Sequence, residues 1–224
     1  MTSDDKGLLI AMVLGDAHLK QLREPHSGRK LPGVLELAHS ETQRAYLQHK
    51  AALLRRILGR TQAINIRSYL SGPQGDRPTI SITVGHKYFR VLRRFLYRGS
   101  RIWMRPAVLQ RLTPHAIALW YLDDGSLSYM KKAGKIHARQ LWLHVCCSRP
   151  EAECVVSYFA EKWGISFRIV TRPCGCVLLC NTTEATKFIA LIEPFVLPAM
   201  SYKIDLKYGH SQRPATQSEA ELIR

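Results

Sequence analysis

The sequence predicts an α+β fold of two pseudo-symmetric αββαββα halves, each a four-stranded antiparallel sheet with helices on one face. Three observations lead to this prediction. One stretch of the chain repeats at an offset of 108 positions, strand-like and helix-like patterns follow the same order in both halves, and capping residues begin equivalent helices. We expect the halves to pack through their equivalent first helices.

The repeat is clearest around two short acidic segments. Residues 14–19 read LGDAHL and align with residues 122–127, LDDGSL, and at the same offset Ser40 aligns with Ser148. The repeat predicts an N-terminal half over 1–97, a linker over 98–111 and a C-terminal half over 112–208. The remaining residues, 209–224, are poor in hydrophobic side chains, so we expect a flexible tail.

The first half begins with an apolar helix, Ser3–Leu14, and Ser40 is placed to cap a longer amphipathic helix. Its predicted elements are the helix 3–14, strands 18–24 and 33–39, the helix 41–58, strands 63–70 and 79–84, and the helix 86–96. A segment rich in arginine, residues 97–111, follows and joins the halves.

The second half repeats this order. Thr113 followed by Pro114 is typical of a helix start, since proline is tolerated at the first helical position, and Ser148 is a second cap residue. Its predicted elements are the helix 113–122, strands 126–130 and 138–145, the helix 150–163, strands 165–171 and 174–180, and the helix 182–192.

Alternation along the strands predicts two chemically different faces in each sheet, since successive side chains point to opposite sides. The apolar face is expected to hold Ile64, Ile66, Leu70, Ile80, Ile82, Val84, Leu141, Leu143, Val145, Phe167 and Ile169. The opposite face would carry Asn65, Arg67, Tyr69, Thr79, Ser81 and Thr83 in the first half, and Gln140, Trp142, His144, Ser166, Arg168 and Arg172 in the second. Such side chains read base edges or hold phosphates, although antiparallel sheets often wet one face without any ligand.

Charge favours a polyanionic partner. The 224 residues include 33 Lys and Arg against 17 Asp and Glu, a formal charge of +16 spread along the chain. Nucleic acid is the simplest partner, and a basic solvated surface is the alternative. We expect a soluble chain without a membrane partner or signal peptide, because no long uncharged apolar run exists and residues 1–6 are polar; the compartment stays open.

The six cysteines all lie in the second half. Because no CxxC pair is present and several cysteines fall on apolar strand patterns, we expect reduced, buried thiols. The alternative is a zinc cluster of His144, Cys146, Cys174 and Cys176.

Small and apolar residues line one stripe of each first helix, at Leu8, Ala11, Met12 and Gly15 and at Ala118, Tyr121, Leu122 and Gly125. This stripe allows two helices to approach closely, so the carboxylates at their C-terminal ends, Asp16 and Asp124, are expected to meet. Carboxylates there face the negative end of the helix dipole and repel each other, which favours bound divalent cations. Such cations could polarise phosphodiesters and activate water; the alternative is that these residues only form turns.

Residues 7–17, GLLIAMVLGDA, and 112–125, LTPHAIALWYLDDG, resemble the two signature helices of LAGLIDADG homing endonucleases. The similarity extends to about Lys203 through residues 197–203, LPAMSYK. It is strongest to the single-chain, two-motif subgroup typified by the yeast mitochondrial omega-intron endonuclease.

The resemblance implies a monomer that recognises a long double-stranded DNA site and cuts both strands across the minor groove, leaving short 3′ overhangs. It implies Mg²⁺ as cofactor, about two or three divalent ions, with Mn²⁺ or Ca²⁺ able to replace it for binding. By motif match, Asp16 and Asp124 would be the metal-binding catalytic acids and the carbonyls of Gly15 and Asp123 further ligands. Lys203 and Arg101 would stand near the reacting phosphates, and the polar strand faces would contact DNA.

Two residues depart from the family pattern. Arg101 stands where lysine is usual, and it keeps a charge but sheds no proton at neutral pH. Cys147 stands where the subgroup often has glutamine. Two rival functions stay open, an intron-RNA maturase and a binding-only relative; the presence of both acids favours cleavage.

Overall fold

The computed structural model describes residues 1–23, 30–59, 64–132 and 135–206, and the chain forms two compact units, Met1–Asp123 and Asp124–Arg224. Each unit contains one four-stranded antiparallel sheet with helices on one face, so the predicted α+β architecture is confirmed. Position 24, Ala63 and the predicted tail lie outside the described residues. None of the helices in the described part of the chain combines the length and apolar character needed to cross a membrane.

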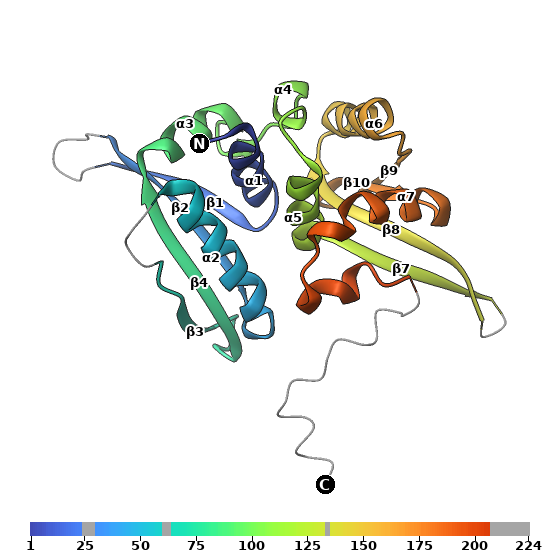
Figure 1. The fold of residues 1–224 in the computed structure, drawn as a ribbon, viewed down its shortest axis with the longest axis horizontal. Coiled ribbons are helices and arrows are strands. Elements are labelled where there is room, and N and C mark those ends of the chain that lie inside the picture. The colour runs from blue at the N-terminus through green and yellow to red at the C-terminus, as the bar shows by residue number, and fades with distance from the viewer. Residues whose placement is uncertain (24–29, 60–63, 133–134, 207–224) are drawn as a thin grey trace, which may run out of the picture. The chain divides into compact units, whose positions relative to one another are not determined.

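The first unit has the sheet order β1-β2-β4-β3, with α2 and α3 packed on its strands (Figure 1). Its elements are α1 (Ser3–Leu14), β1 (Ala17–Arg23), β2 (Lys30–Ser40), the 3-10 turn η1 (Glu41–Gln43), α2 (Arg44–Leu58), β3 (Arg67–Ser71), β4 (Arg77–His86), α3 (Lys87–Leu96), β5 (Tyr97–Arg98), β6 (Arg101–Ile102), α4 (Pro106–Leu109) and α5 (Pro114–Asp124).

The second unit repeats this topology as β7-β8-β10-β9, with α6 and α7 packed on its strands. The equal strand order confirms that the sequence repeat is a structural one. Its elements are β7 (Gly125–Lys132), β8 (Lys135–Cys147), α6 (Arg149–Trp163), β9 (Arg168–Arg172), β10 (Gly175–Cys180), α7 (Thr182–Ile192), and the 3-10 turns η2 (Glu193–Phe195) and η3 (Pro198–Lys203).

Local chemistry explains most helix ends. Thr113 begins α5 as predicted, because its Oγ1 accepts from the Ala116 N–H at 3.3 Å. Both long helices, α2 and α6, end at a glycine in the left-handed region, Gly59 at φ 61° and Gly164 at φ 62°. The prediction that Ser40 caps α2 directly is wrong: a 3-10 turn intervenes and the Ser40 side chain caps no backbone N–H.

The apolar faces of the central strands form the core as predicted. Ile80, Ile82 and Val84 are at most 1% exposed, and Leu141 and Leu143 are wholly buried. The edge strand β3 differs. It begins at Arg67 instead of residue 63, and Leu70, predicted to be buried, is 63% exposed. Because β3 pairs only with β4, at the margin of the sheet, alternation alone does not decide which of its side chains are covered.

The arginine-rich segment between the repeats is not a bare linker. It contains the hairpin β5–β6 and the short helix α4. Pro106 stands at the first position of α4, where proline is tolerated. The predicted halves, 1–97 and 112–208, remain a description of the duplication; the compact units divide after Asp123 instead.

The two first helices, α1 and α5, pack closely within the first unit. A Cβ on Gly7 would stand 2.5 Å from the carbonyl oxygen of Arg111 and 3.7 Å from the Cβ of Ala116. The Asp4 carboxylate accepts a hydrogen bond of 2.7 Å from the Thr113 hydroxyl at the start of α5. Glycine at position 7 therefore permits the predicted helix pairing, and sequence reasoning had not identified it.

Candidate functional site

The first acidic residue, Asp16, stands directly after α1, and its side chain is 39% exposed. The helix ends at Gly15, whose N–H donates to the Ala11 carbonyl at 3.0 Å. A Cβ at position 15 would meet the Asp123 side chain, 2.6 Å from its Cβ. Glycine is thus required for the ends of α1 and α5 to come together, and the Asp16 N–H donates to Asp123 Oδ2 at 3.2 Å.

The Asp123 carboxylate is held by α2. Its Oδ1 accepts from the Tyr46 hydroxyl at 2.8 Å and from Lys50 Nζ at 2.5 Å. Tyr46 and Lys50 stand one helical turn apart on the buried face of α2, which lets both reach the same oxygen. The side chains of Lys50 and Asp123 are both wholly buried, so each charge relies on the other for compensation.

His39 links Lys50 to Asp16. The His39 side chain is 3% exposed at the end of β2, and its Nε2 lies 3.1 Å from Lys50 Nζ. A lysine ammonium only donates, so this contact favours the tautomer in which Nε2 accepts and Nδ1 carries the ring proton. That Nδ1–H faces two oxygens, Gln43 Oε1 at 3.2 Å and Asp16 Oδ2 at 3.4 Å. We call Asp16, His39, Lys50 and Asp123 the Asp16 network.

Asp16, His39 and Asp123 offer possible metal-ligating atoms that all lie within 4.8 Å of one another. The network distinguishes among these atoms. In the tautomer that Lys50 favours, His39 Nδ1 carries a proton. The Asp123 carboxylate accepts from Lys50, Tyr46 and the Asp16 N–H, whereas the Asp16 carboxylate is partly exposed. An oxygen donor at a helix C-terminus fits a hard divalent cation such as Mg²⁺.

Sequence reasoning missed His39, Tyr46 and Lys50. A signal for Lys50 was present, because it follows Leu47 and precedes Leu54 at the spacing of the buried face of α2. A lysine on such a face indicates a buried partner of opposite charge, although the pattern does not say which one.

The second acidic residue, Asp124, is surrounded differently. Lys203, at the end of η3, donates from Nζ to the carbonyl of Gly125 at 3.2 Å, one residue after Asp124. Burial of the thiol, a hydrogen bond to Cys174 and the nearby Asp124 charge raise the pKa of Cys146 to about 11. Burial, together with the charges of Arg172 and Lys203, lowers the pKa of His144. The meeting of Asp16 and Asp124 stays a prediction, as does a role for Arg101, which is exposed on β6.

The predicted DNA-contacting residues of the first sheet lie on its polar side. In the register of β3 and β4, Arg67 is opposite Ser81 and Tyr69 is opposite Thr79, which places each pair on one face. Thr83 continues this face along β4, on the side opposite Ile82 and Val84. Asn65 is exposed just before β3.

The polar face of the second sheet carries an aromatic cluster. The Trp142 Nε1–H donates to Ser128 Oγ at 3.0 Å, and its ring stacks on His144 with centroids 6.4 Å apart. The Arg172 guanidinium lies 5.3 Å from the Trp142 ring centroid. Trp142 is therefore a member of the polar face, with Gln140 on the same strand and Arg168 exposed on β9.

The cysteine prediction is partly wrong. Cys147, Cys176 and Cys180 are buried as expected, but Cys146 and Cys174 are exposed, with their sulfur atoms 2.8 Å apart. Alternation along β8 explains the split, since Cys146 and Cys147 point to opposite faces. Within the described residues, no three of His144, Cys146, Cys174 and Cys176 gather as metal ligands do, so the zinc alternative has no support there.

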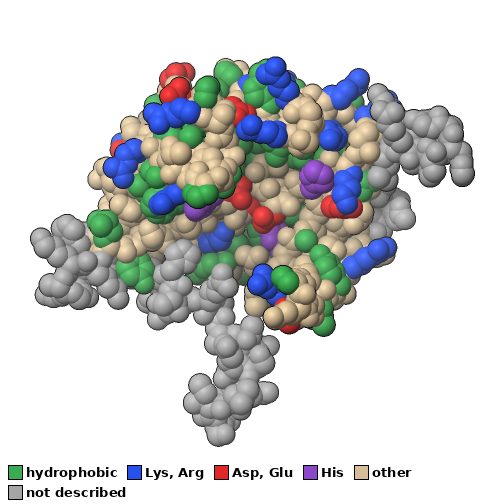
Figure 2. All heavy atoms as spheres, turned by 180° about the vertical axis from the view of Figure 1, so that it is seen from behind, with side chains coloured by type: hydrophobic (Ala, Val, Ile, Leu, Met, Phe, Trp, Pro, Cys, Tyr) green, Lys and Arg blue, Asp and Glu red, His purple; other side chains and the backbone are tan. Residues whose placement is uncertain are grey.

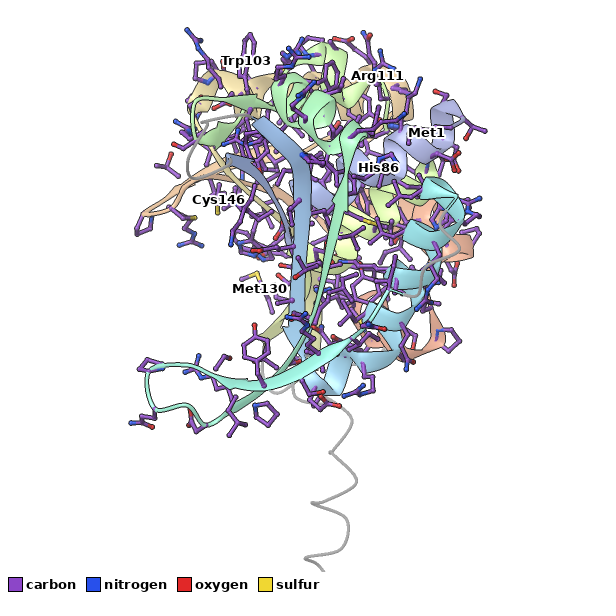
Figure 3. The ribbon with its side chains drawn as sticks, turned by 90° about the vertical axis from the view of Figure 1, so that its left-hand side faces the viewer. Met1, His86, Trp103, Arg111, Met130 and Cys146 are labelled. Atoms are coloured by element: carbon purple, nitrogen blue, oxygen red, sulfur yellow. The ribbon has the colours of Figure 1, made fainter. Side chains whose placement is uncertain are left out.

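A basic segment with interleaved aromatic rings completes the first unit. Residues 77–122 contain nine Lys and Arg and no Asp or Glu. The ring of Trp103, labelled in Figure 3 and 40% exposed, has the guanidinium groups of Arg98 at 5.5 Å and Arg105 at 5.0 Å from its centroid. Lys and Arg side chains are also spread over the face drawn in Figure 2, which agrees with a polyanionic partner.

Comparison with protein families gives a clear match. The model of a family described as the LAGLIDADG DNA endonuclease family matches residues 6–188. A protein named RecA from Mycolicibacterium fallax is 26% identical over 204 residues, which cover 88% of this chain and 45% of that protein. A probable intron-encoded DNA endonuclease 3 from Mycosarcoma maydis is 25% identical over 130 residues, 56% of this chain and 91% of that protein. The chain thus spans less than half the length of the RecA relatives.

Solved structures share the fold. The homing endonuclease I-WcaI bound to its DNA recognition sequence superposes with a TM-score of 0.73 at 19% identity, covering 91% of this chain and 87% of that one. The homing endonuclease I-GzeII in complex with a DNA target gives a TM-score of 0.53 at 9% identity, covering 88% and 86%. At these identities the likeness concerns the fold.

Proposed function

The chain belongs to the LAGLIDADG DNA endonuclease family, and on this basis we propose that it is a homing endonuclease that hydrolyses both strands of a specific, long DNA site. The observation that carries the proposal is the partly exposed Asp16 carboxylate, held at the end of α1 by contacts from two other elements, β2 and α5. Two solved relatives of the same fold are bound to DNA in their structures, which supports DNA as the partner.

We propose a divalent cofactor, Mg²⁺, in about two or three copies, which Mn²⁺ or Ca²⁺ can replace for binding. The residues that would hold it are the carboxylates of Asp16 and Asp124 and the carbonyls of Gly15 and Asp123. When bound, such an ion stabilises negative charge on the reacting phosphate and lowers the pKa of a bound water. The donor set fits, since every proposed ligand is an oxygen.

Other residues of the chain would compensate the negative charge of the phosphate and orient the Asp16 carboxylate. The ammonium group of Lys203 lies one residue beyond Asp124, because its Nζ donates to the Gly125 carbonyl. Arg101 would add a permanent charge suited to an anionic phosphate and unsuited to proton transfer. His39 directs its Nδ1–H toward Asp16, which favours one orientation of that carboxylate.

DNA recognition would use the polar faces of both sheets. Arg67 and Ser81 on the first sheet, and Arg168 and Arg172 on the second, are suited to bases and phosphates. We propose that a monomer binds the major groove with these faces and cuts across the minor groove, leaving short 3′ overhangs. The protein would act wherever the DNA that hosts its coding element resides.

A second candidate function is binding of folded intron RNA. The acid-free segment 77–122 favours it, because Trp103 between Arg98 and Arg105 resembles the stacked cation and ring surfaces that accept unpaired bases.

The test uses host DNA from which the coding element is absent, incubated with the protein and Mg²⁺. Wild type is expected to produce two fragments, and Asp16→Asn and Asp124→Asn to lower the rate about 100-fold or more. Asp76→Asn, in the exposed turn between β3 and β4, is the matched control and should cut normally. Cleavage that survives both substitutions overturns the proposal, and tight intron-RNA binding without cleavage favours the second candidate.

A further inference from the structure

The Asp16 network joins four separate elements through one buried cation. Lys50 Nζ lies 2.5 Å from Asp123 Oδ1 and 3.1 Å from His39 Nε2, and it stands over the Tyr46 ring at 4.4 Å from the centroid. Asp123 Oδ2 accepts from the Asp16 N–H at 3.2 Å, and His39 Nδ1 approaches Asp16 Oδ2 at 3.4 Å. Lys50 therefore reaches both the backbone and the carboxylate of Asp16 through one intermediate residue each.

Packing does not require a cation at this position. Counted back from the glycines that end α2 and α6, Gly59 and Gly164, the residue of the second unit that corresponds to Lys50 is Val155. Val155 and Lys50 are both 0% exposed. Because buried ion pairs can often be replaced by apolar residues without loss of stability, the valine shows the simpler way to fill this place. Lys50 thus points to a role beyond packing.

The chemistry of the ammonium group suggests that role. Lys50 has three donors and no acceptor, so the nitrogen of His39 that faces it must accept. The other nitrogen then carries the proton and turns a positive N–H toward Asp16. Without Lys50, His39 is free to adopt the opposite tautomer, in which a lone pair faces the carboxylate and repels it.

We propose that Lys50 is a positioning residue for Asp16, acting by setting the tautomer of His39 and by holding Asp123 against the Asp16 N–H. The proposal rests on the proposed function, in which Asp16 is one of two catalytic acids. Since the second unit has Cys147 at the place of His39 and Val155 at that of Lys50, the two acids are positioned by different means. Loss of Lys50 is therefore expected to slow cleavage of one DNA strand more than the other.

The first readout is independent of activity. Long-range ¹H–¹⁵N NMR spectra of the histidine rings, at a slightly alkaline pH and without metal, report which ring nitrogen carries the proton. In wild type, His39 is expected as the Nδ1–H tautomer, its signals being assigned by their absence in His39→Phe. In the double variant Lys50→Met/Asp123→Asn, which leaves no buried charge and keeps an acceptor for the Asp16 N–H, the Nε2–H form should appear.

The second readout is cleavage of each strand, followed separately by end labels in single turnovers with saturating protein. In the double variant and in His39→Phe, one strand is expected to be cut about 10- to 100-fold more slowly, so that nicked DNA accumulates. DNA affinity in Ca²⁺ should change by no more than about twofold. His49→Phe, next to Lys50 on α2 but outside the network, is the matched control and should behave as wild type.

These outcomes decide the proposal. It is overturned if wild-type His39 is the Nε2–H tautomer, or if the folded double variant and His39→Phe both cut the two strands at wild-type rates. If the double variant does not fold, His39→Phe, which leaves the Lys50–Asp123 pair in place, decides alone. A wild-type protein that cuts nothing overturns the proposed function and the link to cleavage, whereas the NMR result still decides whether Lys50 sets the tautomer.

Discussion

The two units share a strand order but surround their acidic residues with different chemistry. Asp16 stands among His39, Lys50 and Asp123, which are buried and charged or polar, whereas Asp124 has Lys203 and the exposed Cys146 nearby. In the second half, Cys147 and Val155 stand at the positions that correspond to His39 and Lys50. In the first half, Gly15 stands at the position that corresponds to Asp123.

This difference shows which features a duplicated fold retains. The strand order depends on many alternating apolar residues, and no single substitution removes it. The surroundings of each acid depend on a few individual residues, so they can change while the fold persists. The glycine and aspartate at positions 15 and 123 illustrate this: the small residue of one half makes room for the carboxylate of the other.

The largest expected effect comes from breaking the buried ion pair of the first unit. Lys50→Met removes the ion-pair partner of the buried Asp123 carboxylate, and we expect the free energy of unfolding to fall by about 3–5 kcal/mol. Urea unfolding followed by circular dichroism measures it. Val155→Ala, at the corresponding place, should cost less because it only shortens an apolar side chain. Equal losses in the two variants would remove the energetic contrast between the halves.

Most of the fold was predictable from sequence because it depends on many alternating apolar residues. The strands 79–84 and 138–145 alternate cleanly and are central in their sheets, so their buried faces were predicted correctly. The edge strand β3 was not, because at a margin coverage depends on neighbours that alternation does not specify. Thr113 was identified as a helix start because capping uses residues close in sequence.

The site was predictable only in part. Asp16 stands out because it ends a helix within the repeat, but its surroundings come from contacts between distant residues. Lys50 and Asp123 are 73 positions apart, and no local pattern connects them. Cys146 was predicted to be buried with its neighbours, although alternation along β8 places it on the polar face.

A smaller effect should follow from closing the space between the ends of α1 and α5. Gly15→Ala places a methyl group against the Asp123 side chain, so we expect a loss of about 1–3 kcal/mol in stability and slower cleavage. Thermal unfolding and the plasmid assay measure the two effects. Gly85→Ala is the matched control, since a Cβ there would meet only Val34, at an ordinary 3.9 Å. If both variants unfold at the wild-type temperature, the close approach is not needed.

A third comparison is between the polar face of the second sheet and the helices that cover its other face. Arg172→Gln removes the cation beside Trp142, and we expect DNA affinity to fall modestly and the slope of log K against log salt to shrink by about 1. Arg149→Gln changes another exposed arginine, on α6, which pairs with Glu153 and should not touch DNA. Fluorescence anisotropy across a salt series compares them. An equal change in slope for both would show that charge acts without regard to face.

The smallest expected effect concerns the exposed sulfur pair that only the second unit possesses. Cys146, labelled in Figure 3, and Cys174 have sulfur atoms 2.8 Å apart, so a two-electron oxidant such as diamide, which takes up both thiol protons, should join them as a disulfide. The raised pKa of Cys146, about 11, keeps its proton on at neutral pH, and the reaction should therefore accelerate as the pH rises toward that value.

Intact-mass measurement after the reaction detects the loss of two hydrogens, and Cys174→Ser is expected to abolish it. Because the two sulfur atoms are already close, the fold and its thermal stability should change little. Oxidation that proceeds equally in Cys174→Ser would mean that another pair reacts, and the contrast would then lie in reactivity elsewhere in the second unit. Oxidation confined to Cys146 and Cys174 would instead show that the second unit has a reactive thiol pair near Asp124, whereas the first unit has the Asp16 network around its own acid.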